Sequence, residues 1–140
     1  MNDTIRRQAI NKYIQKDPFA AYLGAKIEII EPGHSRVSLT VTEEMTNFHG
    51  TTHGGVIFAL GDVAFAAASN SHGLMAVALN VSISFLKATK AGDKLVAEAN
   101  EKHAGARMAL YDITVRDEQT GELVAKSQDL AYRKNEQFVK

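Results

Sequence analysis

Asp62 is the residue of this sequence whose surroundings most clearly suggest chemistry. It stands in the segment from Val56 to Ala68, in which all residues except Asp62 itself are apolar or glycine. An ionised carboxylate in such surroundings is unfavourable unless it is paired, and burial raises its affinity for a proton. A carboxylate of this kind can act as a general base or as a nucleophile. The structural alternative is a buried aspartate that only accepts hydrogen bonds from the backbone or from Ser and Thr hydroxyls.

Gly54 and Gly55 stand at the start of this apolar segment, which predicts a helix. The first N–H groups of a helix have no partner inside it, and the helix dipole adds about half a positive charge at that end. Such an end can bind a carbonyl oxygen or an anion. When a carbonyl carbon is attacked, negative charge develops on the carbonyl oxygen, and one well-placed donor increases the rate by about 10² to 10³. The Gly54 amide is therefore a candidate donor.

The spacing of Gly54 and Asp62 separates the two groups within one helix. Eight residues correspond to about 12 Å along the axis, too far for both to contact one carbonyl. Two copies related by a two-fold axis could place each carboxylate near the other copy's helix start. The spacing therefore favours a homodimer in which both subunits form the active site.

Composition limits the remaining functions. With 140 residues, 16 Lys plus Arg, 16 Asp plus Glu and no cysteine, the chain is expected to form one domain, residues 1–140, without disulfides. Zero net charge argues against nucleic acid as a partner. The apolar segment is too short to cross a bilayer, and no secretion signal is evident, so we expect a cytoplasmic protein without membrane contact. His49 and His53 are four residues apart, but they lie in a glycine-containing loop without a third ligand, so no metal site is expected.

The elements around the apolar helix are predicted from the periodicity of apolar residues. Thr4–Lys16 has the pattern of an amphipathic helix that ends at Asp17-Pro18, so residues 1–18 are expected to pack on the domain. Short turns separate the expected strands, which should therefore be antiparallel in an α+β fold. These strands are Gly24–Ile30, Ser35–Val41, Leu74–Leu86, Asp93–His103 and Met108–Tyr132, the last interrupted by a loop at Asp117–Glu122. A curved sheet, helped by a second subunit, is expected to cover the apolar helix on every side.

The motif Asn47-x-x-Gly-x-x-His53-Gly54-Gly55-x-x-x-x-Leu60-x-Asp62, followed by the segment 80–86 and by Gly92-Asp93, resembles hotdog-fold acyl-CoA thioesterases of the phenylacetate-degradation type. The resemblance extends from about Phe19 to Tyr132. It implies a long central helix wrapped by a five- or six-stranded antiparallel sheet. It also implies a homodimer that commonly assembles into a homotetramer, and no cofactor, since coenzyme A is part of the substrate.

The resemblance implies a role for each matching residue. Asp62 is expected to be the nucleophile or the general base, and the Gly54 amide of the opposite subunit is expected to polarise the thioester carbonyl. Asn47 is expected to position the attacking water or the acid, and His53 to steady the carbonyl end of the substrate. Gly55 is expected to allow close packing at the helix start.

Further substrate contacts are expected around this centre. Some relatives have a Ser or Thr that holds the water on the strand after the helix, where this chain has Ala78. Asn80 or Ser82 is the expected substitute, since strict alternation places both on the face of Ala78. Phe58 is a candidate for the floor of an acyl pocket, although such residues usually belong to a core. The remaining candidates, for the phosphates of coenzyme A, are Lys87 and Arg107, with ordinary surface charge as the alternative.

The expected function is hydrolysis of small acyl-CoA thioesters, with aryl-acetyl groups among the candidate acyl groups. Two alternatives remain open from the sequence, because one fold can host several functions. One is an enoyl-CoA hydratase or dehydratase, which usually pairs a histidine with an acid at a spacing absent here. The other is a non-catalytic acyl-CoA binder.

Overall fold

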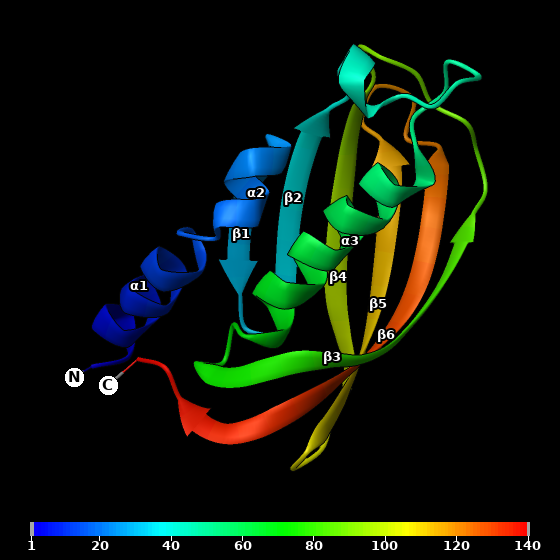
Figure 1. Ribbon diagram of the computed structural model, residues 1–140. Coiled ribbons are helices and arrows are strands. Elements are labelled where there is room, and N and C mark those ends of the chain that lie inside the picture. The colour runs from blue at the N-terminus through cyan, green and yellow to red at the C-terminus, as the bar shows by residue number, and fades with distance from the viewer. Residues whose placement is uncertain (1, 140) are drawn as a thin grey trace.

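The computed structural model describes residues 2–139 as one six-stranded antiparallel sheet with a long helix lying across its concave face (Figure 1). The strand order is β1-β2-β4-β5-β6-β3. The strands are β1 (Lys26–Glu31), β2 (His34–Thr40), β3 (Leu74–Phe85), β4 (Lys94–Ala104), β5 (Met108–Asp117) and β6 (Leu123–Gln137). The helices are α1 (Asp3–Ile14), α2 (Pro18–Leu23) and α3 (Gly54–Ser69), with a 3-10 turn at Glu43–Met45. The predicted α+β hotdog fold is confirmed.

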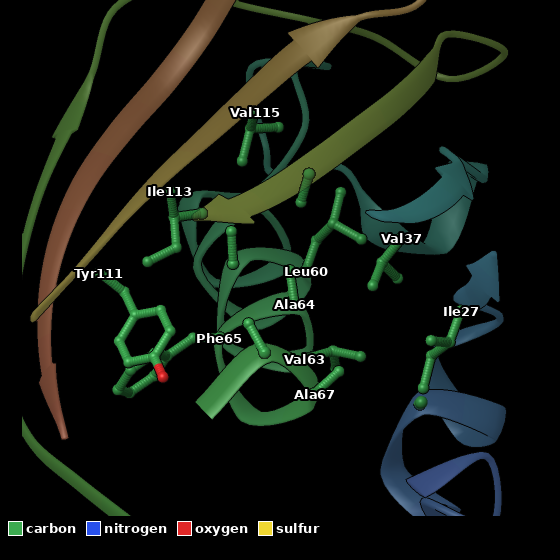
Figure 2. Packing of buried hydrophobic residues seen from close by; sticks show 14 of the residues in the cluster. Ile27, Val37, Leu60, Val63, Ala64, Phe65, Ala67, Tyr111, Ile113 and Val115 are labelled. Atoms are coloured by element: carbon green, nitrogen blue, oxygen red, sulfur yellow. The ribbon is translucent and has the colours of Figure 1, made fainter. Parts of the chain in front are cut away.

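The core lies between α3 and the concave face of the sheet (Figure 2). Leu60, Ala64 and Phe65 of α3 are at most 2% exposed. Phe65 packs edge-on against Tyr111 of β5, with ring centroids 5.6 Å apart. Small alanines let the helix approach the strands closely, which explains the alanine-rich second half of the segment.

One side of α3 is not covered by its own chain. Gly55 and Phe58 are exposed, and Ala59, Asp62 and Ala66 are only partly buried. These positions recur every three or four residues and therefore form a stripe along one side of the helix. The sheet of one chain therefore leaves this side of the helix open, and its cover by a second subunit stays a prediction. Within residues 2–139, none of the helices has the length and apolarity needed to cross a membrane.

The N-terminal region contains two helices where one was predicted. Pro18 begins the six-residue helix α2 rather than simply ending α1, because proline fits the first turn of a helix and Asp17 caps its start. Gly24, in the left-handed conformation with φ of 82°, ends α2. Helix α1 is held to the rest of the chain through Ile10, which is 1% exposed.

A bulge in β3 changes which face its side chains occupy. The pairing with β6 shifts register between Ala78 and Asn80. Ala78 lies opposite Ala131, which is fully buried on the inner face, whereas Asn80 and Ser82 lie opposite the more exposed residues of β6. The prediction that Asn80 and Ser82 share the face of Ala78 is therefore wrong, and the two side chains point away from α3.

Candidate active site

Asp62 lies on the uncovered stripe of α3, at the wall of a small cavity between the helix and the sheet. On the helix side the same cavity is lined by Phe58 and Gly61. On the sheet side it is lined by Val81 of β3 and Ile113 of β5. Burial, reinforced by the negative charge of Asp17, raises the pKa of Asp62. Among the described residues no hydrogen bond compensates its carboxylate. This environment does not support the alternative of a fully hydrogen-bonded structural aspartate, and it suits a general base or nucleophile.

The loop before α3 is held by its own hydrogen bonds. Oδ1 of Asn47 accepts from the backbone N–H of His49 at 2.9 Å and from that of Thr51 at 3.3 Å. Because this oxygen is engaged inside the loop, the side-chain amide group of Asn47 is what remains for contacts elsewhere. Thr52 anchors the end of the loop through its buried hydroxyl, which accepts from the Thr89 hydroxyl at 2.6 Å. The sequence analysis did not identify this threonine pair.

His53 is the N-cap of α3. Its Nδ1 accepts a hydrogen bond from the N–H of Gly55 at 3.0 Å, while its own backbone N–H donates to the carbonyl of Met45 at 2.8 Å. The cap satisfies the Gly55 amide, so Gly55 contributes to the helix start rather than to an open donor site. A side chain at Gly55 would also meet Nδ1 of His53 at 3.2 Å.

The N–H of Gly54 is the open donor at this helix start. No hydrogen bond from it exists among residues 2–139, as expected for the first residue of a helix. Gly54 borders a cleft of about 350 Å³ together with Phe85, Leu86 and Lys87. The Phe85 ring lies 3.5 Å from where a Cβ of residue 54 would stand.

Lys87 and Arg107 do not meet within one chain. Lys87 borders the Gly54 cleft, and its Nζ lies 2.7 Å from Oε1 of Glu122 in an ion pair. Hydrogen bonding with Glu122 raises the pKa of Lys87. Arg107 lies in the hairpin between β4 and β5, which projects from the end of the sheet opposite the loop before α3 (Figure 1). One subunit therefore places only Lys87 near Gly54.

Asp62 and Gly54 are likewise separated within the chain, because both belong to α3 and are more than two helical turns apart. A larger cleft of about 520 Å³ flanks α3 on the side of its C-terminal half. Its walls include Val63 and Ala66 of α3, and Tyr13 and Phe138 from the two ends of the chain. The sequence analysis did not anticipate this cleft, because its walls come from segments distant in sequence.

The sequence predicts that His49 and His53 do not form a metal site, and the structure shows what surrounds their side chains. Within residues 2–139 no three His, Asp or Glu side chains are grouped closely enough to hold a metal ion. The His49 ring lies tilted against the Phe48 ring, with ring centroids 4.3 Å apart. His53 is engaged in its cap, so the two histidines do not act as a pair.

Known proteins are similar to this chain in sequence and in structure. The thioesterase superfamily matches residues 49–124, a range that contains the loop, α3 and Asp62. The chain belongs to the thioesterase superfamily. The acyl-coenzyme A thioesterase PaaI of Escherichia coli is 43% identical to this thioesterase over 105 residues, which cover 75% of each protein.

Solved structures give the same result for this thioesterase. The E. coli PaaI protein from the phenylacetic acid degradation operon superimposes with a TM-score of 0.89 and 36% identity, covering 94% of this chain and 96% of the other. A Streptococcus mutans protein solved with bound acetyl-CoA superimposes with a TM-score of 0.77 and 32% identity, covering 81% and 90%. The predicted hotdog thioesterase family is therefore confirmed, and the chain is a hydrolase that acts on thioester bonds.

Proposed function

We propose that this thioesterase hydrolyses small acyl-CoA thioesters to the free acid and coenzyme A, with Asp62 as the reacting carboxylate. The observation that carries the proposal is the environment of Asp62, a half-buried carboxylate without a compensating hydrogen bond on the one stripe of α3 that its own chain leaves uncovered. The relatives named acyl-CoA thioesterase, and the S. mutans structure with acetyl-CoA, support coenzyme A as the carrier.

The active site is proposed to form between two copies of the chain. Packing of the uncovered stripe against a second copy would bury its apolar residues, and the outer edge of β3 is free to pair with the same strand of that copy. In this dimer the Gly54 amide of one copy would face Asp62 of the other. Asn47 would position the water and His53 the carbonyl end. Further pairing of dimers into a tetramer, and a cytoplasmic location, belong to the same proposal.

The chemistry needs no cofactor in this proposal. Acting as a base, Asp62 takes a proton from water while the water oxygen bonds to the carbonyl carbon, and the Gly54 amide stabilises the developing oxyanion. The C–S bond then breaks, and the leaving thiolate takes the proton from Asp62. Acting as a nucleophile, Asp62 would instead form a mixed anhydride that water hydrolyses. Hydrolysis in ¹⁸O-labelled water under single-turnover conditions separates the routes, because only the anhydride route can leave label in the Asp62 carboxyl.

The acyl group is proposed to enter the 520 Å³ cleft beside α3. The rings of Tyr13 and Phe138, 4.7 Å apart, stand in its wall and suit a flat apolar group such as aryl-acetyl. Phe58 lies on the side of the small cavity at Asp62 and would contact the acyl group near the carbonyl. A role in phenylacetate catabolism would follow from that acyl preference.

The nucleotide end is proposed to lie at Lys87, beside the Gly54 cleft. A phosphate would displace Glu122 from its ion pair with Lys87. Arg107 would contribute from another copy of the chain, since it belongs to the hairpin between β4 and β5, at the other end of the sheet (Figure 1). Asn80 and Ser82, on the outer face of β3, would likewise contact substrate only through an assembled dimer.

A panel of acyl-CoA substrates, with a thiol reagent to follow the release of coenzyme A, tests the function. Asp62→Asn should decrease kcat by about 10² to 10⁴. Asp3→Asn is the matched control, since Asp3 is an exposed aspartate at the start of α1 and does not border the cavity at Asp62. The proposal fails if Asp62→Asn releases thiol at the wild-type rate, or if enoyl-CoA is hydrated without release of thiol.

A further inference from the structure

Asp129 of β6 is a second carboxyl group that the mechanism above does not use. It is 1% exposed, and its Oδ1 is buried without a hydrogen-bond partner among residues 2–139. Buried polar groups are almost always hydrogen-bonded, and an unpaired buried carboxylate is costly. A group of this kind therefore requires an explanation.

Asp129 faces the same cavity as Asp62. In the sheet it lies between Val81 of β3 and Tyr111 of β5, on the face that packs against α3. The cavity is lined by Asp62 and Asp129 together, and it leaves about 10 Å³ for the centre of a water molecule. That volume corresponds to the space that a single water needs.

No cation neutralises this pair from the surrounding elements of the described chain. On β6, Lys126 borders the cavity, but its Nζ forms an ion pair with Asp112 at 3.2 Å. On β5, the Tyr111 hydroxyl donates to Glu101 at 2.8 Å. On β3, the lining residues Val81 and Ile83 cannot ionise.

The charges on the two carboxyl groups therefore affect one another. Burial raises the pKa of Asp129 to about 6, against the opposing effect of the Ser127 hydroxyl and with a further rise from the negative charge of Asp62. Such coupling acts in both directions, so an ionised Asp129 also disfavours the ionised form of Asp62. The negative charge of Asp17 also raises the pKa of Asp62, by less than burial does.

We propose that Asp129 is a positioning residue for the reaction: across a cavity of one water, its negative charge increases the affinity of Asp62 for the proton that Asp62 removes from the attacking water. This inference rests on the proposed function and on the base-catalysed route within it. Asp129 keeps its own bonds throughout the reaction. The proton moves from water to Asp62 and then to the leaving thiolate, and Asp129 changes only the strength of the base.

The pH dependence of kcat tests this role. In Asp129→Asn, loss of the negative charge should move the acidic limb of the kcat profile to lower pH. It should also decrease kcat near neutral pH by about three- to tenfold, since a weaker base transfers the proton less efficiently. KM should stay within about twofold, because Asp129 does not contact substrate. Asp3→Asn, with the same change in charge at an exposed position of α1 outside this cavity, should follow the wild-type profile. An unchanged acidic limb in Asp129→Asn overturns the proposal.

A direct titration separates this proposal from the proposed function. Carboxyl ¹³C chemical shifts of the unliganded protein should show, in the wild type, a second change at Asp62 at the pH where Asp129 ionises, and this second change should be absent in Asp129→Asn. Reciprocally, Asp129 should titrate at lower pH in Asp62→Asn. If these shifts appear but no acyl-CoA is hydrolysed, the carboxyl pair stands and the proposed function fails. If hydrolysis depends on Asp62 but the titrations are independent, the pair is refuted. Asp129→Ser serves the same measurements if Asp129→Asn does not fold.

Discussion

Nδ1 of His53 accepts a hydrogen bond from the backbone N–H of Gly55 at 3.0 Å, so the first turn of α3 is capped by an imidazole. The acceptor role assigns the proton of the neutral ring to Nε2, which is then free to donate elsewhere. One histidine thus fixes the helix start and offers a donor beside the open amide of Gly54. The residue therefore stabilises the helix start and, in the proposed dimer, would also contact the substrate.

Substitution of His53 separates the two roles. His53→Ala should lower the free energy of unfolding by about 1 kcal/mol, because the cap is lost, whereas His53→Asn should restore most of it, since asparagine is a good N-cap. Both variants should lose activity, because neither places an imidazole donor near the carbonyl. Urea denaturation and kcat/KM measure the two effects. Full activity in His53→Asn would show that only the cap matters.

Gly54→Pro should remove a single hydrogen-bond donor with little change in the fold. Proline is favoured at the first position of a helix, and the preceding His53, with φ of −61° and ψ of 134°, already has the extended conformation that proline requires before it. Loss of the oxyanion donor should decrease kcat by about 10² to 10³. The control is Gly54→Ala, which keeps the N–H and meets the Phe85 ring at an ordinary 3.5 Å. Equal activity of the two variants would contradict the role of the amide.

The sequence predicted the regular elements because their periodicities are local. The apolar helix and the hairpins follow from residue patterns within about ten positions, and they are confirmed. The six-residue helix α2 was missed because Pro18 was interpreted only as the end of the preceding helix. The bulge near Leu79 was missed because neither glycine nor proline marks it. Each error therefore comes from a signal that was ambiguous or absent in the sequence.

Part of the candidate site could be predicted because some of its residues are also close together in the sequence. Asp62, Gly54 and His53 lie in one continuous segment, so their relation to the helix start could be derived. Asp129 is 67 positions from Asp62, and only the sheet pairing places the two at one cavity. A signal was available, because Asp129 follows Ser127 and precedes Ala131 on the inward-facing side of the strand. Strand alternation alone would have placed a carboxylate in the core.

The raised pKa of Asp129 predicts that this residue lowers stability at neutral pH. Because the folded protein binds the Asp129 proton more tightly than the unfolded chain does, stability falls as pH rises from about 4 to about 6 and stays low above that window. The shift of about two units corresponds to an effect of about 3 kcal/mol. Asp129→Asn should therefore be more stable than the wild type at pH 7.5, and the gain should shrink towards pH 4. Urea denaturation at both pH values measures it, and a gain independent of pH would contradict the assignment.

Mixing two inactive variants tests whether the site is shared between subunits. In a dimer of one Asp62→Asn chain and one Gly54→Pro chain, one site combines the intact Asp62 of the second chain with the intact Gly54 of the first. The other site carries both substitutions. Random exchange makes about half of the dimers mixed, so about a quarter of the wild-type activity should return. Unfolding and refolding the two chains together, with each refolded alone as control, measures this recovery. If activity does not return although size-exclusion chromatography with differently tagged chains shows mixed dimers, Asp62 and Gly54 do not act across a subunit interface.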